Sequence, residues 1–208
     1  LVFLLDVSGS MSDYNKLPLV KESLKLLINS MRVDDRLAIV VYAGAAGVVL
    51  PSTSGKEKPK MLEALNNLEA GGSTNGGEGI ELAYKIALDN LTPTGNNRII
   101  MATDGDFNVG IYDQNALNSL IISHREKDIF LTMLGFGYGN MKDDTMESLA
   151  NKGNGNYGYI DDMKEAKKFL GTESTGTMFA IAKDVKIQID FDKSKVKSYR
   201  LIGYENRL

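Results

Sequence analysis

The chain opens with Leu1-Val2-Phe3-Leu4-Leu5-Asp6-Val7-Ser8-Gly9-Ser10, a short apolar run that leads directly into a carboxylate and two hydroxyls. The run Val2–Leu5 is apolar at every position, which is typical of a strand buried on both faces. Gly9 makes a tight turn after the strand sterically easy. The segment therefore predicts a buried strand that presents hard oxygen atoms at the point where it ends.

Three further runs have the same continuous apolar character, and amphipathic helical patterns separate them. The predicted strands are Val2–Leu5, Leu37–Ala43, Arg98–Ala102, Ile129–Leu134 and a short one near Tyr157–Ile160, and the predicted helices are Leu17–Met31, Lys58–Leu68, Ile80–Leu91, Asn115–Lys127, Asp143–Lys152 and Lys164–Phe169. Alternating strands and helices indicate an α/β fold, a Rossmann-like doubly wound and mainly parallel sheet with helices on both faces.

One connection is too short for this parallel pattern. The link Gly44-Ala45-Ala46-Gly47 joins Leu37–Ala43 to Val48–Leu50, and a crossover helix needs a dozen or so residues. These two strands must therefore form a hairpin. We expect one antiparallel strand at an edge of the sheet.

Composition excludes several function classes. The formal net charge is −3 and the Lys and Arg residues are dispersed, so the basic surface of a nucleic-acid-binding protein is missing. The chain has no cysteine, which excludes disulfides and thiolate ligands. No apolar run approaches the roughly 18 residues of a transmembrane segment. A hydrophobic fraction of 43% and a charged fraction of 25% are ordinary for a globular domain.

The pattern changes near the C-terminus. After about Ala182 the apolar residues Val185, Ile187, Ile189 and Phe191 alternate with polar ones, as in a half-buried strand. We therefore predict a main domain at 1–181 and the start of a β-rich segment at 182–208. The chain begins within a strand and without an initiator Met, so we expect it to come from a longer protein.

A second carboxylate is predicted beside the first. Arg98–Ala102 is followed by Thr103-Asp104-Gly105, and ligands of doubly wound sheets bind outside the carboxyl ends of strands where the strand order reverses. Asp6 and Asp104 should be neighbours at that point. The glycine-rich loop Gly71–Gly77 leads into a helix and can bring Ser73 or Thr74 to the same edge.

These residues suit a divalent cation. Two carboxylates and three hydroxyls are hard oxygen donors, but they carry little charge and leave part of a shell of about six oxygens to water. Mg²⁺ keeps water ligands readily, and Mn²⁺ or Ca²⁺ are the alternatives. One water is replaceable by a carboxylate oxygen, so a partner protein that offers Asp or Glu can join the ion.

This arrangement resembles the metal-ion-dependent adhesion site (MIDAS) of von Willebrand factor A domains. Asp6, Ser8 and Ser10 match its D-x-S-x-S element, Thr74 its threonine, and Thr103-Asp104-Gly105 its T-D-G element. The resemblance extends over about Leu1–Phe179 and includes Asp35–Ala43 and Leu134–Gly137. It implies metal ligation by Asp6, Ser8, Ser10, Thr74 and Asp104.

The C-terminal region adds to the resemblance. The stretches Ala182–Ile187 and Tyr199–Arg207 are similar to bacterial members in which the A domain continues into a β-rich region. Many of those relatives are associated with the cell envelope, so the resemblance implies an extracytoplasmic location.

Other site chemistries fit the sequence less well. Asp104–Asn108 is similar to the first half of an EF-hand loop, but Val109 and Asn115 stand where that loop needs Gly and Glu. Aspartyl-phosphate phosphatases need a second Asp where Ser8 stands. The G-x-S-x-G elbow of serine hydrolases and the nucleotide-binding glycine motifs are absent. The single histidine, His124, is expected to pack at a helix end.

We therefore expect a non-enzymatic binding module whose metal bridges to an acidic residue of a partner. An alternative is a structural or scaffold domain of a bacterial envelope protein, in which the metal mainly stabilises the fold. A metal-dependent hydrolase is a remote alternative.

Overall fold

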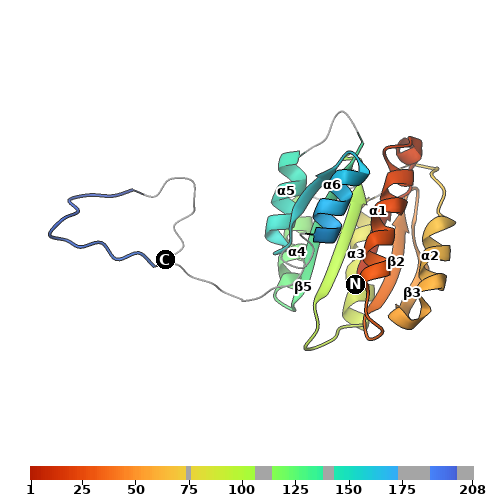
Figure 1. Cartoon of the computed structure of the whole chain (residues 1–208), viewed down its shortest axis with the longest axis horizontal. Coiled ribbons are helices and arrows are strands. Elements are labelled where there is room, and N and C mark those ends of the chain that lie inside the picture. Colours follow the sequence, from red (N-terminus) through yellow and green to blue (C-terminus); the bar gives the residue numbers. More distant parts are fainter. Residues whose placement is uncertain (74–75, 106–113, 138–142, 173–187, 201–208) are drawn as a thin grey trace.

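The computed structural model of the 208-residue chain describes residues 1–73, 76–105, 114–137, 143–172 and 188–200. Figure 1 shows a central sheet with helices in front of it and behind it. The strands are β1 (Val2–Asp6), β2 (Arg36–Tyr42), β3 (Ala46–Ser54), β4 (Asn97–Thr103), β5 (Ile129–Phe136) and β6 (Tyr157–Ile160). They pair in the order β3-β2-β1-β4-β5-β6.

All strand pairs are parallel except β2 with β3, which pairs antiparallel at the edge of the sheet. The short link between these two strands forces this direction, as the sequence predicted. The structure confirms the doubly wound, mainly parallel α/β fold with one antiparallel edge strand.

The helices form two layers. They are α1 (Leu17–Ser30), α2 (Lys58–Asn66), α3 (Gly76–Asp89), α4 (Gln114–Arg125), α5 (Asp143–Lys152) and α6 (Met163–Lys167), with short 3₁₀ turns at Gly9–Ser12 and Gly55–Glu57 and a π-helical turn at Lys168–Thr172. The apolar sides of α1, α2 and α6 share one core cluster, and those of α3, α4 and α5 share the other. Among the described residues, no helix is both long enough and apolar enough to cross a membrane.

Strand β1 divides its side chains between the two cores. Phe3 and Leu5 belong to the cluster under α1, whereas Val2 and Leu4 belong to the cluster under α3. Alternate residues of a strand point to opposite faces, so a strand covered on both sides is apolar throughout. This explains why β1 carries no polar side chain until its last residue, Asp6.

The strand order reverses between β1 and β4. The chain runs outward from β1 to β2 and β3 on one side, and outward from β4 to β5 and β6 on the other. Leu5 pairs with Ala102, so β1 and β4 end at the same level of the sheet. The loops after these two strands therefore diverge and leave an edge where a ligand can bind.

The predicted β-rich segment at 182–208 is described by the structure only at residues 188–200. The described segment 188–200 contains turns without a helix or strand, and within it the rings of Phe191 and Tyr199 lie 4.5 Å apart. Residues 173–187 and 201–208 lie outside the described residues, so both the boundary at 181 and the β-rich segment remain predictions.

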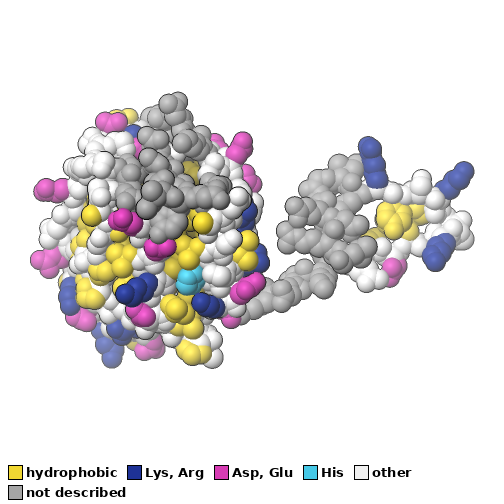
Figure 2. All heavy atoms as spheres, turned by 180° about the vertical axis from the view of Figure 1, so that it is seen from behind, with side chains coloured by type: hydrophobic (Ala, Val, Ile, Leu, Met, Phe, Trp, Pro, Cys, Tyr) yellow, Lys and Arg dark blue, Asp and Glu magenta, His cyan; other side chains and the backbone are white. Residues whose placement is uncertain are grey.

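Figure 2 shows the face opposite to that of Figure 1, on which apolar side chains lie among charged ones.

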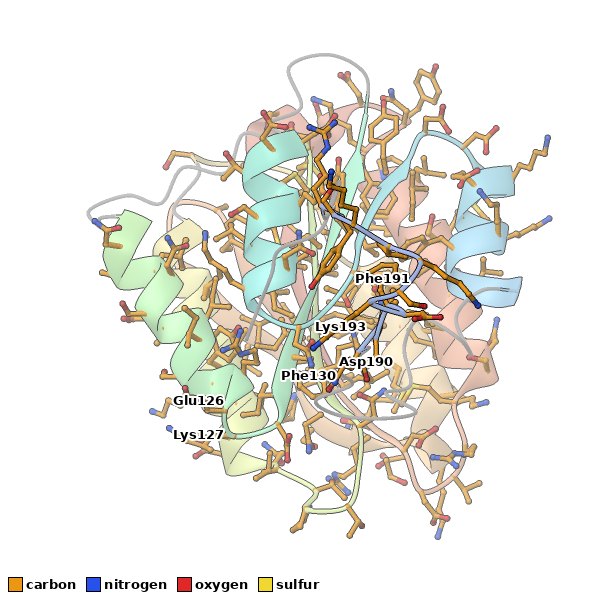
Figure 3. The ribbon with its side chains drawn as sticks, turned by 90° about the vertical axis from the view of Figure 1, so that its left-hand side faces the viewer. Glu126, Lys127, Phe130, Asp190, Phe191 and Lys193 are labelled. Carbon is orange, nitrogen blue, oxygen red and sulfur yellow. The ribbon has the colours of Figure 1, made fainter. Side chains whose placement is uncertain are left out.

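His124 lies in the last turn of α4 and stacks on Tyr84 of α3, with ring centroids 4.3 Å apart and an interplanar angle of 12°. Burial lowers the pKa of the imidazole, and Lys127, labelled in Figure 3 just beyond the end of α4, lowers it further. His124 is thus a packing residue between two helices.

This pKa shift predicts a loss of stability in mild acid. The folded state disfavours the imidazolium, whereas the unfolded chain binds the proton near pH 6.5, so stability falls as the pH drops through about 6.5. His124 is the single histidine of the sequence. His124→Phe keeps the ring and removes the titration. We expect the midpoint of thermal unfolding to fall less for this variant between about pH 7.5 and about pH 5.5; equal falls in both proteins would contradict this role.

Candidate metal centre

The carboxylate of Asp6 lies at the end of β1 and is buried, with 1% of the residue exposed. Its Oδ1 accepts a hydrogen bond from the backbone N–H of Ser8 at 2.9 Å. Its Oδ2 accepts from the hydroxyls of Tyr42 at 3.1 Å and Thr103 at 3.2 Å. An ionised carboxylate has about four acceptor positions, so these three donors leave one on Oδ1. Asp6 is therefore fixed in orientation, and an acceptor position on Oδ1 remains for a further ligand.

Burial raises the pKa of two groups at this edge, the Asp6 carboxyl and the Tyr42 phenol. Loss of hydration raises the pKa of the Asp6 carboxyl, the hydrogen bonds from Ser8 lower it, and the negative charge of Asp104 raises it again. Burial raises the pKa of the Tyr42 phenol well above its ordinary range, and the charge of Asp6 adds to that shift. Tyr42 consequently stays a phenol and donates a hydrogen bond to Asp6. A positive charge at this edge would relieve the repulsion between Asp6 and Asp104.

The turn after β1 brings two hydroxyls together. Oγ of Ser8 and Oγ of Ser10 lie 3.0 Å apart, Ser8 buried and Ser10 exposed. Ser8 stands at the N-cap of the 3₁₀ turn Gly9–Ser12, yet its side chain makes no capping hydrogen bond. The hydroxyl is therefore not used for the capping that serine commonly performs at such positions. It faces Ser10 at the rim of the sheet.

Asp104 follows β4 and meets a cation from α1. Its side chain is 4% exposed, and Oδ2 lies 2.9 Å from Nζ of Lys16. The same ammonium donates to the backbone carbonyl of Ser10 at 3.0 Å. Lys16 thus links the turn after β1 to the residue after β4.

The glycine-rich loop is held against the turn after β1. The N–H of Gly71 donates to the carbonyl of Val7 at 2.7 Å, and the N–H of Gly9 donates to the carbonyl of Gly72 at 3.0 Å. These bonds bring the segment that precedes Thr74 to the edge where Ser8 and Ser10 lie. Thr74 itself, like Asp106 and Asn108 of the EF-hand-like stretch, lies outside the described residues.

Gly79 of α3 allows this helix to pack closely against Tyr42, which donates to Asp6. A Cβ at Gly79 would lie 2.9 Å from Cβ and 3.0 Å from Cγ of Tyr42, closer than ordinary packing allows. Glycine lets the first turn of α3 lie directly on the fully buried tyrosine. The glycines that make this helix start poor in intrinsic helix propensity thereby position a donor to Asp6.

The described residues of this edge form an oxygen site of low charge: two carboxylates, the hydroxyls of Ser8 and Ser10, and nearby backbone carbonyls. Within the described ranges, no group of three or more His, Cys, Asp or Glu side chains is arranged to hold a metal. Oxygen donors of this kind suit Mg²⁺, which accepts hydroxyl and water oxygens beside one or two carboxylates.

Two residues of this edge were not predicted from the sequence to belong to the site. Tyr42 was assigned only to a buried strand, although its place opposite Asp6 in the β1–β2 register carries the relevant signal. Lys16 stands at the N-cap of α1, where the helix dipole disfavours a cation. A lysine at this position signals that a negative charge lies nearby.

The two buried tyrosines give a matched test of the hydrogen bonds around Asp6. Tyr42→Phe removes one of its three donors, and a hydrogen bond to a charged group contributes about 1.5–3 kcal/mol, so the free energy of unfolding should fall by about that amount. Among the described residues the hydroxyl of Tyr84 is buried without a hydrogen-bond partner, so Tyr84→Phe should leave stability unchanged or raise it. Urea unfolding of the metal-free protein measures both. Similar losses in the two variants would show that the bond to Asp6 contributes nothing specific.

Comparisons with known proteins agree with this fold. A family profile for the von Willebrand factor type A domain matches residues 1–172, and one described as "Uncharacterized protein YfbK, C-terminal" matches residues 176–208. The uncharacterized protein YfbK of Escherichia coli (strain K12) is 48% identical over 207 residues, which cover 100% of this chain and 36% of that protein. The chain thus spans about a third of the length of this relative.

Two solved structures have the same fold. The von Willebrand factor type A structure from Catenulispora acidiphila has a TM-score of 0.69 at 24% identity, over 85% of this chain and 42% of that one. Proximal thread matrix protein 1 from the mussel byssus, described with a zinc-occupied MIDAS motif, has a TM-score of 0.64 at 19% identity, over 85% of this chain and 46% of that one. With the profile match over most of its length, the chain belongs to the von Willebrand factor type A domain family.

Proposed function

We propose that this chain is a non-enzymatic protein-binding module that holds one divalent cation at Asp6, Ser8, Ser10, Thr74 and Asp104 and uses it to bind an acidic side chain of a partner. Mg²⁺ is the proposed ion, with Mn²⁺ or Ca²⁺ as substitutes. The observation that carries the proposal is the hydroxyl pair of Ser8 and Ser10, 3.0 Å apart at the edge defined by the two carboxylates. Domains of this family are commonly protein-interaction modules.

The residues present fit such an ion. The set is made of hard oxygens, the Asp6 carboxylate is held in one orientation by three donors, and the Ser8 hydroxyl is not used for capping. When bound, a divalent ion supplies a Lewis-acidic coordination position for an external carboxylate. Thr74 enters the proposal through the backbone bonds that hold Gly71 and Gly72 against the turn after β1.

The local charges favour an acidic partner. Lys16 offsets one of the negative charges of Asp6 and Asp104, so the edge has a net positive charge once a divalent ion is added. An anionic oxygen is then attracted, and a cationic side chain is repelled. Tyr14, four positions after Ser10 and 80% exposed, offers an aromatic surface of the kind that is enriched in protein interfaces.

Catalysis has less support than binding. His124, the single histidine of the sequence, stacks on Tyr84 between α3 and α4. It belongs to the packing of two helices. We therefore propose a role in binding for the hydroxyls of Ser8 and Ser10.

Thermal unfolding tests the metal site. We expect Mg²⁺ added to the chelator-treated protein to raise the unfolding temperature, because a ligand at about 100 times its Kd stabilises the native state by about 2.7 kcal/mol. Ser10→Ala removes an exposed hydroxyl of the set and should diminish this rise. Ser12→Ala changes an exposed serine of the same turn and should keep it. A rise of equal size in both variants would place the metal elsewhere.

A peptide pair tests the acidic partner. An Asp-containing peptide should bind to the Mg²⁺-loaded protein more tightly than the same peptide with Asn, and chelator should abolish the difference. Asp104→Asn should also abolish it while leaving the circular dichroism spectrum unchanged. If Mg²⁺ raises stability but the two peptides bind equally, the scaffold role, in which the metal mainly stabilises the fold, replaces the binding role.

A further inference from the structure

The ammonium of Lys16 lies within the proposed metal centre. It contacts Oδ2 of Asp104 at 2.9 Å and the backbone carbonyl of Ser10 at 3.0 Å, and its side chain is 17% exposed. Its two partners belong to residues that the proposed function assigns to the ion. A cation of the chain itself thus contacts the same carboxylate that a divalent cation requires.

The fold makes room for the stem of this lysine. Gly137 directly follows β5 and has φ +92°, a conformation that residues with a side chain rarely adopt. A Cβ at this position would lie 2.8 Å from Cε and 2.9 Å from Cγ of Lys16. The hydroxyl of Tyr159 donates to the carbonyl of Gly137 and helps to fix it. The aliphatic stem of Lys16 therefore passes over a glycine that β6 holds in place.

The position of Lys16 contrasts with that of the other lysine ion pairs in the described part of the chain. Lys25 pairs with Glu22, Lys60 with Glu57, Lys168 with Glu165, and Lys195 with Asp192, all between residues three positions apart. Lys16 and Asp104 are separated by 88 positions, and Asp104 is almost completely buried. A partly buried pair is weakened less by solvent than an exposed one, so this contact holds Asp104 firmly.

We propose that Lys16 is a built-in competitor of the divalent cation: it pairs with Asp104 in the metal-free protein and thereby sets how tightly the centre takes up metal. This inference rests on the proposed metal-binding function and adds a control on it. The ammonium neutralises part of the charge of the Asp6–Asp104 pair, which stabilises the metal-free fold. It also repels an incoming cation and must yield its contact with Asp104. Occupancy, and with it capture of an acidic partner, then depends on the free concentration of the ion.

Lys16→Met tests this competition, because methionine keeps much of the stem and removes the charge. Isothermal titration of the chelator-treated chain with Mg²⁺ and with Mn²⁺ should show binding on the order of tenfold tighter or more, since removal of a like charge a few ångströms away is worth at least a factor of that size. Thermal unfolding without metal should show a lower midpoint than in the unsubstituted protein. Lys16→Gln, a second uncharged variant, should change affinity in the same direction if Lys16→Met folds poorly.

Two controls isolate the position of the charge. Lys16→Arg keeps the charge and should bind metal no more tightly than the unsubstituted protein. Lys25→Met makes the same change of net charge in the middle of α1, where Lys25 pairs with the exposed Glu22. This variant should leave metal affinity unchanged. A gain in affinity for Lys25→Met equal to that of Lys16→Met would overturn the proposal.

The outcomes separate this inference from the proposed function. If the unsubstituted protein binds Mg²⁺ and Lys16→Met binds equally or less tightly, competition is overturned, Lys16 only positions Asp104, and the metal site stands. If neither protein binds any divalent ion, the proposed function fails as well. Binding by the uncharged variants alone would support competition in its strongest form.

Discussion

A carboxylate enclosed at the end of β1 is the constraint on which this edge of the molecule depends. Asp6 is removed from water by the two helical layers, and an ionised carboxylate in that position needs hydrogen-bond donors. The donors come from three places: the turn after β1, the end of β2, and the end of β4. Strand order brings these ends together, because β1 lies between β2 and β4. The three central strands and the turn after β1 thereby supply the hydrogen-bond donors of the buried Asp6 carboxylate.

The other polar groups of this edge differ in how far they are exposed. Ser10 is exposed, and the side chain of Asp104 is reached by Lys16 from α1. The edge thus combines a buried carboxylate that three donors hold in place with an exposed hydroxyl. A buried, oriented carboxylate beside hydroxyls at the surface is the physical basis on which we propose metal binding and partner recognition.

Most of the architecture was predictable because it depends on local patterns. The four strands with continuous apolar runs and the short strand near Tyr157–Ile160 were placed within two residues at their ends, and the short Gly44–Gly47 link required the antiparallel pair. Strand β3 is longer than predicted, since Ala46–Ser54 is held by its pairing with β2 and not by apolar composition. Helix α3 begins at Gly76, ahead of the predicted Ile80, and Gly79 in its first turn permits a close approach to Tyr42. The juxtaposition of Asp6 with the strand that ends at Asp104 followed from the reversal of strand order. The roles of Tyr42 and Lys16 depend on contacts between distant positions, which periodicity does not encode, and Thr74 remains a prediction.

The hydrogen bond from Thr103 to Asp6 joins residues 97 positions apart, across the pairing of β1 with β4. A chain that is still being synthesised has β1, α1 and the β2–β3 hairpin available early, but it lacks the strand that completes the enclosure of Asp6. Loop closure over such a separation is slow compared with local structure formation. We therefore expect the centre to form only when the two halves of the sheet join, and an N-terminal fragment that ends before β4 to have the turn after β1 without the centre.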